Sequence, residues 1–370
     1  MLFVAEPMLG RDEKVALAEV IDSGWITMGQ RVRSFEQEFA AYHDVLEAVA
    51  TSSCTAGLHL VMRALGIGPG DEVLVPSLTF VATSNAVLYV GATPVFVDIQ
   101  SAHVPHASPG HAAARCTSRT KAIIVMHYGG YTVDLAPWRE LAKSRGLYLI
   151  EDAAHAAGVT GVGQETDAAV FSFFGNKNMT TAEGGMVFAR DAAVLEDVRR
   201  MRSHGMTTSS WERAQGHSLV YDVTTMGYNY RMDELRAAVG LAQLSRLNVW
   251  NDKRQRLSQM YRSLLRERCP LVEVPFSGSW SSVCHVLPVV LPADTERHAV
   301  MQAMHEANVQ TTVHYPPIHL FSYYRDSLPS PSLPVTEDFA ARELSLPLHP
   351  GLEPEQVDVV VQTLAHCLTP

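Results

Sequence analysis

Three polar segments of the sequence contain residue types that could take part in chemistry, and each follows an apolar run. The segment SSCTAG opens a helical pattern and contains Thr55. The segment EDAAH places Glu151, Asp152 and His155 directly after YLI. The segment FSFFGNKNMTTAEGG places Lys177 in a loop rich in Gly, Asn and Thr. A lysine amine can form a covalent imine, a carboxylate can balance a cation, and a helix N-terminus can hold a phosphate.

Each of these residues also has an ordinary structural explanation. Ser53 or Thr55 can cap a helix, and an acidic residue after a strand often does the same. A lone loop lysine usually lies in solvent. The three segments together nevertheless supply the parts that a pyridoxal phosphate (PLP) site needs, provided that the fold brings them to one edge of a sheet.

Seven short apolar runs in the first two-thirds of the chain predict strands. They cover residues 47–51, 73–76, 94–98, 121–126, 147–151, 168–174 and 186–190. Helical patterns between most of them cover residues 55–65, 81–90, 135–145 and 193–203. This alternation predicts an α/β fold with a mostly parallel sheet, in which ligands bind beyond the carboxyl ends of the strands. The last two strands are joined by a short loop, so 186–190 is expected to be antiparallel to its neighbour.

The pattern changes after residue 233. Two long helical stretches, DELRAAVGLAQLSRL and NDKRQRLSQMYRSLLRER, reach about residue 268. A strand at 286–291, a helix at 295–308, a strand at 310–314 and a final helix near 355–368 predict a smaller α+β unit, in which SLPSPSLPVTED is a loop. We therefore expect a large domain over 1–249 and a small C-terminal domain over 250–370.

Composition excludes several classes of partner. The net charge is −10 and no Lys/Arg-rich run is present, which argues against binding to nucleic acid or to anionic membranes. Five scattered cysteines without C-x-x-C spacing argue for a reducing compartment. The N-terminus lacks the pattern of a signal peptide, and no apolar run has the length of a membrane helix. A cytoplasmic protein is expected.

Three histidines, His103, His106 and His111, lie in the stretch IQSAHVPHASPGHAAAR and could suggest a metal site. The stretch itself contains no carboxylate or thiolate that would complete such a site. The stretch is therefore predicted to be a solvated loop, and no metal is expected.

Ordered motifs along essentially the whole chain resemble the DegT/StrS family of PLP-dependent sugar aminotransferases, which have the fold-type I architecture. These motifs are SGWITMG, SSCTAGLHL, GDEVLVPSLTFVAT, GATPVFVD, TKAIIVMHYGG, IEDAAHAAG, FSFFGNKNMTTAEGGMV, RSHGM, GYNYRMDELRAAVGLAQL, HYPPIH and LSLPLHP. The residues of the motifs SGWITMG, PSLTF, HYGG and FSFFGNKN are most similar to the corresponding motifs of transaminases that install an amine at C4 of a nucleotide-linked 4-keto sugar. Perosamine synthases and the UDP-4-amino-arabinose transaminase are examples. The three-histidine stretch departs from the family's pattern.

The resemblance implies a role for individual residues. Lys177 would form the Schiff base with PLP and move the substrate proton, and Asp152 would pair with the pyridine nitrogen. The other implied cofactor contacts are His155 near the phenolic oxygen, Phe80 stacked on the ring, Thr55, Ala56 and Ser172 at the phosphate, and Asn229 at the phosphate of the neighbouring subunit's cofactor. Candidate substrate-side residues are Trp25, Thr27 and Arg231.

The implied activity is transfer of an amino group from L-glutamate to C4 of a nucleotide-diphosphate-linked 4-keto (6-deoxy)hexose, for polysaccharide or natural-product glycosylation. A homodimer with shared active sites is expected. Two alternatives stay open: a family member that aminates a 3-keto sugar or a keto-cyclitol, and a PLP-binding regulatory protein without turnover. The Lys177–Asp152 pair argues against the second. Lys177 also argues against the dehydratase branch of the family, in which a histidine replaces this lysine.

Overall fold

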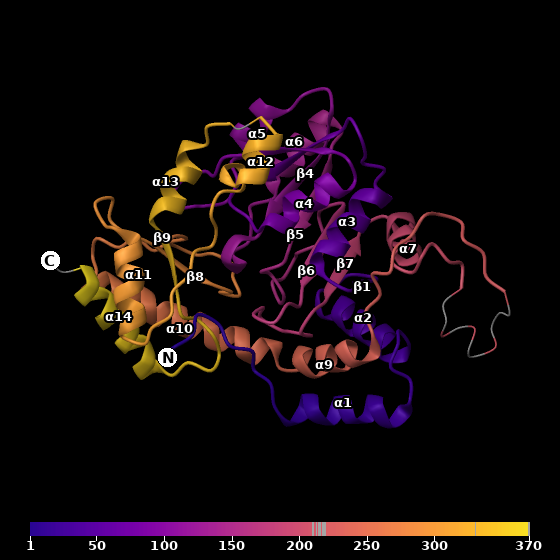
Figure 1. The fold of residues 1–370 in the computed structure, drawn as a ribbon, viewed down its shortest axis with the longest axis horizontal. Helices are drawn as coiled ribbons and strands as arrows, with labels where there is room; N and C mark the ends of the chain where they lie inside the picture. Colours follow the sequence, from indigo (N-terminus) through magenta and orange to yellow (C-terminus); the bar gives the residue numbers. More distant parts are fainter. Residues whose placement is uncertain (209–210, 212, 214–215, 217–219, 330, 369–370) are drawn as a thin grey trace.

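A seven-stranded sheet forms the centre of the larger half of the molecule (Figure 1). The computed structural model describes residues 1–208, 211, 213, 216, 220–329 and 331–368. The strands are β1 (Val49–Thr51), β2 (Glu72–Pro76), β3 (Thr93–Val97), β4 (Thr120–Met126), β5 (Tyr148–Asp152), β6 (Ala168–Ser172) and β7 (Gly185–Ala189). Their order in the sheet is β1-β7-β6-β5-β4-β2-β3. All neighbours are parallel except β7, which is antiparallel to both β1 and β6. The α/β class and the reversed last strand are confirmed.

Helices cover both faces of this sheet, which explains why its strands are apolar on both sides. On one face lie α3 (Cys54–Ala64), α4 (Val81–Tyr89) and α7 (Ala192–Met201). On the other lie α2 (Gln30–Tyr42), α5 (Pro109–Arg115), α6 (Ala136–Arg145) and α9 (Glu234–Leu244). The N-terminal helix α1 (Arg11–Ser23) packs along α9. The sequence patterns do not predict α1, α2 or α5.

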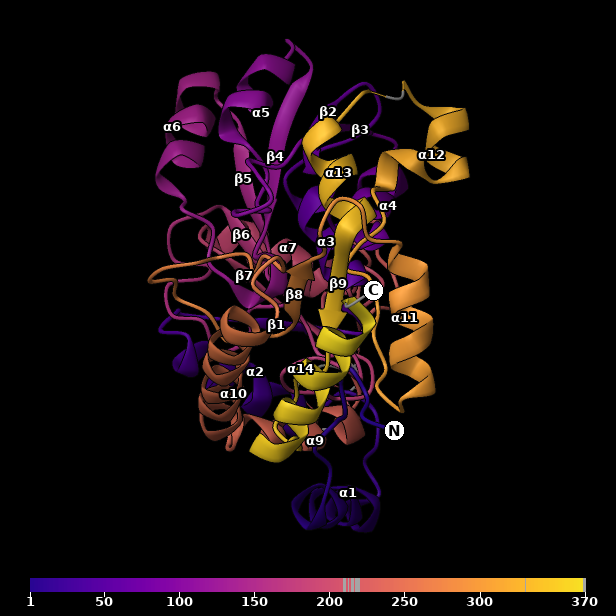
Figure 2. The same cartoon turned by 90° about the vertical axis from the view of Figure 1, so that its left-hand side faces the viewer.

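The smaller half is built on a two-stranded antiparallel sheet, β8 (Leu287–Val290) and β9 (Glu343–Leu346). Figure 2 shows the helices around it. They are α10 (Leu247–Arg268), α11 (Arg297–Glu306), α12 (Ser322–Ser327), α13 (Pro334–Arg342) and α14 (Pro354–Leu368), with the short turns η1 (Tyr128–Gly130) and η2 (Ile318–Leu320) between the halves. The hydrophobic core of this half also includes Leu78 and Tyr128 from the larger half. The predicted domain boundary, between 249 and 250, falls inside α10 and stays a prediction.

Two details of the smaller half differ from expectation. The predicted strand at 310–314 is wrong: Val309 and Thr312 make only isolated bridges, to Leu2 and Ser345. The pairing with β9 stops at Thr312, because the amide of His314 donates to the side chain of Glu343 instead of a backbone carbonyl. The predicted loop SLPSPSLPVTED is also partly wrong, because α13 starts at its Pro334, a residue whose fixed φ suits the first turn of a helix.

The first residues of the chain lie on the smaller half. Leu2 forms a parallel bridge with Val309, and the amide of Leu348 donates to the carbonyl of Val4. The amide of Val4 also donates to the side chain of Gln310 at 3.0 Å. The N-terminus therefore supplies an edge segment to a unit formed from residues more than 300 positions away.

No described helix combines the length and the apolar character that crossing a lipid bilayer requires.

Candidate active site

The sheet brings the three polar segments to one edge. Strands β5 and β6 are parallel neighbours, so Asp152 at the end of β5 and the loop after β6 lie side by side. Strand β1 runs in the same direction, because it is antiparallel to β7, which is itself antiparallel to β6. The helix start at Cys54 therefore lies at the same edge, and its thiol is close enough for its pKa to respond to the charges of Asp152 and Lys177.

The loop that carries Lys177 is closed at its base by backbone hydrogen bonds. The amide of Phe173 donates to the carbonyl of Gly184 at 2.9 Å, and the amide of Thr181 donates to Phe173 at 2.9 Å. A Cβ on Gly185 would lie 2.6 Å from the amide nitrogen of Cys54, so β7 passes directly against the start of α3. This close approach fixes the lysine loop beside the helix N-terminus.

Asp152 is a buried carboxylate held by two donors. The Thr83 hydroxyl donates to Oδ2 at 2.6 Å, and the amide of Ala154 donates to Oδ1 at 3.1 Å. A second hydroxyl, Thr79, lies 2.9 Å from that of Thr83. Burial raises the pKa of Asp152, while the two donors and the charge of Lys177 oppose the rise. Sequence reasoning missed Thr83, although it is the final residue of the motif GDEVLVPSLTFVAT.

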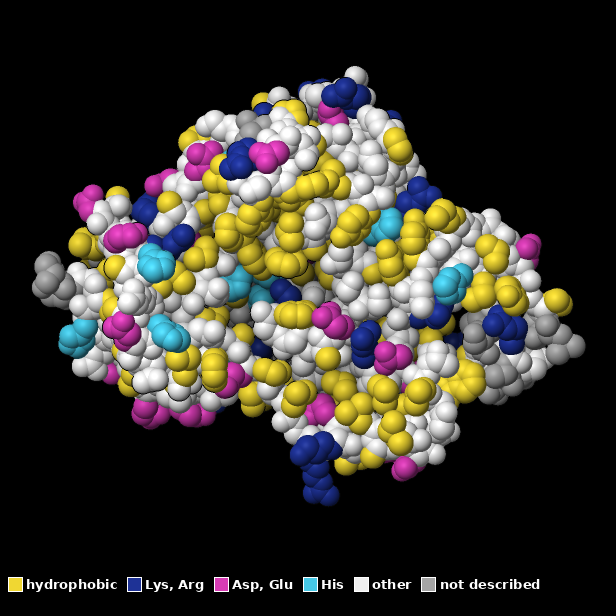
Figure 3. Space-filling view, in the orientation of Figure 1, with side chains coloured by type: hydrophobic (Ala, Val, Ile, Leu, Met, Phe, Trp, Pro, Cys, Tyr) yellow, Lys and Arg dark blue, Asp and Glu magenta, His cyan; other side chains and the backbone are white. Residues whose placement is uncertain are grey.

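Lys177 is a half-buried amine surrounded by neutral imidazoles. Among the described residues none forms a hydrogen bond with its Nζ. Burial lowers the pKa of Lys177 to about 8, against the opposing charges of Asp152 and Cys54. Burial, and then the charge of Lys177, lower the pKa of His314 to about 4 and that of His155 well below its usual range. The amine is therefore easily deprotonated near neutral pH, and the rings around it carry no charge. Figure 3 shows histidine side chains in a central hollow ringed by hydrophobic ones.

His155 is oriented by contacts at both ring nitrogens. Its Nδ1 accepts from the amide of Gly129 at 3.2 Å, so in the neutral ring Nε2 carries the proton and donates to the Tyr315 hydroxyl, 2.8 Å away. Gly130 has φ +83°, and a Cβ there would lie 2.8 Å from the carbonyl oxygen of His155. The two glycines of HYGG thus allow the chain to approach His155 closely.

Sequence reasoning also missed residues of the site that come from the smaller half, among them His314, Tyr315 and His285. Tyr315 comes from the motif HYPPIH. His285 comes from the segment SVCHV, which resembles no catalytic or ligand-binding motif. The His285 ring lies 4.2 Å from that of His155, and its Nδ1 is 2.9 Å from the side-chain oxygen of Asn178, the residue after the lysine. These three residues belong to the second half of the chain, so only the packing of the two halves brings them here.

Phe80 lies at the N-cap of α4 with 55% of its surface exposed, and its ring centroid is 6.0 Å from that of Tyr315. A large exposed aromatic ring beside polar groups offers a surface on which a flat π-system can stack.

The predicted phosphate residues lie in two neighbouring turns. Thr55 and Ala56 are in the first turn of α3. The Ser53 side chain caps this helix by accepting from the amide of Ala56 at 3.1 Å, which confirms the capping interpretation for Ser53. Ser172 ends β6, and its hydroxyl accepts from the amide of Phe174 at 3.3 Å. The Thr55 hydroxyl makes no hydrogen bond to the described residues, which leaves it available to a ligand.

Asn229 lies on the surface, beside the start of α3 in its own chain. It forms an isolated bridge with Ser203, and the carbonyl of Tyr230 accepts from the amide of Ser52 at 2.7 Å. The Asn229 side chain is exposed.

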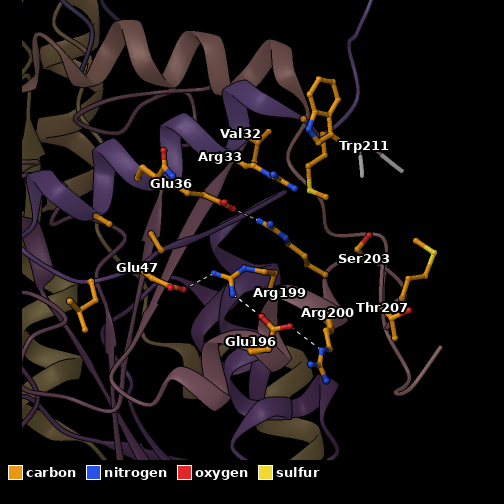
Figure 4. Close-up of a pocket in the computed structure, with 18 residues that line it drawn as sticks. Val32, Arg33, Glu36, Glu47, Glu196, Arg199, Arg200, Ser203, Thr207 and Trp211 are labelled. Carbon is orange, nitrogen blue, oxygen red and sulfur yellow. Dashed lines mark hydrogen bonds and ion pairs between the residues drawn. The ribbon is translucent and has the colours of Figure 1, made fainter. Parts of the chain in front are cut away.

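Two of the predicted substrate-side residues, Trp25 and Arg231, contact residues that line a separate hollow of about 650 Å³ between α2 and α7 (Figure 4). Trp25 packs edge-on against Trp211, which lines this hollow, and Arg231 donates to Ser203, which also lines it, at 3.4 Å. Thr27 is exposed. The arginines drawn in Figure 4 are largely neutralised by ion pairs: Arg199 with Glu47 and Glu196, Arg200 with Glu196, and Arg202 with Glu36. Within a single chain, neither Lys177 nor Asp152 lines this hollow.

The three-histidine stretch is more structured than expected. His106 is buried against Phe276, with its Nε2 3.2 Å from the carbonyl of Tyr131, so the prediction of a solvated loop is wrong there. The residues around His111 form α5, and its Nδ1 accepts from the amide of Asp98. His103 pairs with Glu273 at 2.5 Å. Over the described part of the chain, no three His, Cys, Asp or Glu side chains gather in a way that could hold a metal ion.

The site as a whole fits PLP on its own chemistry. It offers a lysine amine without a described partner, a buried carboxylate across from it, an exposed aromatic ring, and a helix start with an available threonine hydroxyl. These four groups match an aldehyde, a pyridine nitrogen, a flat ring and a phosphate respectively.

Comparison with known proteins points the same way. Residues 7–365 match the model of the DegT/DnrJ/EryC1/StrS aminotransferase family. Spore coat polysaccharide biosynthesis protein SpsC of Bacillus subtilis (strain 168) is 36% identical, covering 97% of this chain and 95% of SpsC.

Solved structures are similar over almost the whole length. Helicobacter pylori PseC, an aminotransferase involved in the biosynthesis of pseudoaminic acid, superposes with a TM-score of 0.92 at 28% identity, covering 99% of this chain and 98% of PseC. NtdA from Bacillus subtilis, with the bound cofactor PMP (pyridoxamine phosphate), has a TM-score of 0.88 at 30% identity, covering 96% of this chain and 81% of NtdA.

Proposed function

Because the chain belongs to the DegT/DnrJ/EryC1/StrS aminotransferase family, whose members are PLP-dependent sugar aminotransferases, we propose that it moves an amino group from L-glutamate to C4 of a nucleotide-diphosphate-linked 4-keto (6-deoxy)hexose. One observation carries the proposal: Lys177, with its pKa lowered to about 8, faces the buried carboxylate of Asp152. The motifs SGWITMG and FSFFGNKN resemble those of C4-aminating transaminases, which supports C4 as the position of the new amine.

Each residue of the site has a separate proposed role. Bound PLP supplies an electron sink. Lys177 holds the cofactor and, as a neutral amine, moves the proton at the substrate's Cα. Asp152, itself held by Thr83 and the amide of Ala154, keeps a proton on the pyridine nitrogen. Phe80 would stack on the cofactor ring, and His155 would lie near its phenolic oxygen.

Thr55, Ala56 and Ser172 of the same chain would hold the cofactor phosphate. These residues lie in adjacent turns at the start of α3 and the end of β6. The positive end of the helix dipole and the small side chains suit a dianion there.

A second copy of the chain completes the site. The segment 220–226 exposes four large apolar side chains just before Asn229: Val220 (78%), Tyr221 (53%), Val223 (53%) and Met226 (70%). Such a run indicates a surface that another protein covers. In the proposed homodimer this segment lies on the partner, and Asn229 reaches the partner's cofactor phosphate.

The substrate side would be shared in the same way. Trp25 and Arg231 contact residues of a hollow that Lys177 and Asp152 of the same chain do not line, so their proposed role is in the partner's site. The net charge of −10 gives little long-range attraction for a diphosphate, so recognition rests on such local groups.

Mixing two inactive variants tests the shared site. Dimers of Lys177→Ala and dimers of Asn229→Asp should each lack activity. In Asn229→Asp the reason is that the new carboxylate repels the cofactor phosphate. Dissociating and reassociating an equal mixture should restore about a quarter of wild-type activity, since half of the dimers are hybrids and each has one site with both native residues. Mixing Lys177→Ala with Asp152→Asn is the matched control: both residues belong to one chain's site, so no activity should return. Recovery in the control but not in the first mixture would contradict the proposed crossing.

A half-reaction screen tests the substrate. L-Glutamate should convert the yellow PLP form to the colourless PMP form, and a 4-keto-6-deoxyhexose linked to UDP, dTDP or GDP should return the colour. Mass spectrometry should then find an amine at C4. If the three nucleotide sugars leave the PMP form unchanged while a 3-keto sugar or a keto-cyclitol reoxidises it, the C4 assignment is wrong. A protein that binds PLP but does not bleach with L-glutamate or another amino acid would instead be the regulatory alternative.

A further inference from the structure

A buried glutamate outside the cofactor contacts is connected to the site through His314. Glu343 begins β9 and is fully buried. Its Oε2 accepts from the backbone amide of His314 at 2.9 Å. Its Oε1 lies 2.6 Å from the Ser345 hydroxyl, which in turn lies 2.8 Å from Nδ1 of the His314 ring. The three side chains form an unbroken chain of hydrogen bonds.

The His314 ring is held in one position at the edge of the Lys177 cluster. The Tyr128 hydroxyl donates to its backbone carbonyl at 2.5 Å, and Thr312 and Ser345 pair through their backbones. Its ring lies perpendicular to that of His155, with centroids 6.4 Å apart. Nδ1 faces Ser345, and Nε2, on the far edge of the ring, makes no hydrogen bond to the described residues.

The numbers of protons and acceptors allow two arrangements of the hydrogen bonds between Glu343, Ser345 and His314. When Glu343 is ionised, the single proton of Ser345 is donated to it, so Ser345 must accept from Nδ1–H and Nε2 is a bare acceptor. When Glu343 is protonated, its Oε2 still has to accept from the His314 amide. The acid proton is then on Oε1 and is donated to Ser345, Ser345 donates to Nδ1, and Nε2 carries the proton.

We propose that Glu343, Ser345 and His314 form a proton relay that stores a proton on Glu343 and switches Nε2 of His314 between acceptor and donor. On uptake, Nε2 takes one proton from the site, Nδ1 passes its proton to Ser345, and Ser345 passes its own to Glu343. Each group keeps its valence, and the net change is one proton moved from the site to the buried carboxyl. The bare Nε2 suits a hydroxyl or an ammonium group, and Nε2–H suits a carbonyl or a carboxylate. Glu343 and Ser345 are thus positioning residues that act through His314.

The groups that face Glu343 allow both states near neutral pH. Burial raises the pKa of Glu343 to about 8, while Ser345, the His314 amide and the positive charge of Arg297 on α11 act in the opposite direction. Tyr128 and Tyr315 also face it; burial first, and then nearby negative charges that include Glu343, raise the pKa of each. The low pKa of His314 keeps its ring neutral in either arrangement.

The relay is tested by determining the tautomer of His314 by NMR. The ¹⁵N and ¹³C chemical shifts of the protein labelled at histidine are measured with and without PLP. The signals of His314 are assigned as those that are lost in the His314→Gln variant. In the wild type, Nε2–H at about pH 6 should give way to Nδ1–H at about pH 9.5. Glu343→Gln is nearly isosteric, and its amide can only donate to Ser345, so His314 should remain Nε2–H throughout. Glu306→Gln, on the exposed part of α11, should behave as the wild type.

Two results would overturn the relay: one unchanging tautomer in the wild type over this range, or a Glu343→Gln protein that switches as the wild type does. Ser345→Ala gives an independent test if Glu343→Gln does not fold, because removing the hydroxyl should uncouple His314 from pH. A switch that persists in Ser345→Ala contradicts the relay as well. The shifts of the PLP-free protein do not depend on the proposed sugar, so failure of the relay and failure of the proposed function are separate outcomes.

Discussion

Replacing Lys177 with alanine is expected to reduce transamination at least about a thousandfold, because both the covalent hold on the cofactor and the proton transfer at Cα depend on its amine. The fold should survive, since the loop is closed by backbone hydrogen bonds at Phe173 and Thr181 that the substitution leaves intact. PLP should still bind without a covalent link through the phosphate and ring contacts. Single-turnover kinetics with L-glutamate and near-UV circular dichroism measure the two effects.

Chemical trapping identifies the lysine directly. Borohydride reduction of the PLP-loaded wild type should leave the cofactor on the peptide that contains Lys177. Lys143→Ala, on the exposed surface of α6, is the matched control and should keep both the label and the activity. Label recovered on a different lysine would disprove the assignment of Lys177.

Replacing Asp152 with asparagine is expected to slow both half-reactions by about 10²–10³-fold, the usual cost of removing a preorganised electrostatic group from a site. The asparagine oxygen can still accept from Thr83 or from the amide of Ala154, so the fold is kept. The negative charge that holds a proton on the pyridine nitrogen is lost. Because the charge of Asp152 raises the pKa of Lys177, that pKa should also fall below about 8.

Absorbance titration of the amine and stopped-flow rates of each half-reaction measure these changes. Asp167→Asn is the matched control at the opposite end of the sheet, where Asp167 accepts from the amide of Leu149 at 2.8 Å. It should leave the rates unchanged. An Asp152→Asn enzyme with near wild-type rates would show that the ring nitrogen finds its proton elsewhere.

The sheet and the two central groups could be predicted because they depend on local sequence. Apolar runs fixed all seven strands, and the short connection before β7 fixed its direction. Once β5 and β6 are parallel neighbours, Asp152 and the Lys177 loop must meet at one edge. The proximity of Asp152 and the Lys177 loop therefore follows from the order of the strands.

The features that were missed depend on long-range packing or on weak local signals. His285 and Tyr315 reach the site only because the smaller half packs against the larger, and periodicity carries no information about that contact. Helices α1 and α2 begin after glycines, Gly10 and Gly29, rather than after the Ser, Thr, Asp or Asn that marks a helix start. In the predicted strand at 310–314, the composition favours a strand, but the amide of His314 donates to the side chain of Glu343 and the backbone pairing is limited to isolated bridges.

The attachment of the N-terminal segment to the smaller half has a consequence for synthesis on the ribosome. Leu2 and Val4 are synthesised well before their partners Val309, Gln310 and Leu348, which lie more than 300 residues later. At the usual translation rate of about 5–20 residues per second, about 15–60 s pass between the synthesis of this segment and the synthesis of its partners. The strands of the larger sheet are all synthesised within that interval, whereas the contacts of Leu2 and Val4 form only after residues 309–348 have been made. A C-terminal fragment made without residues 2–4 would therefore lack one edge of its own fold.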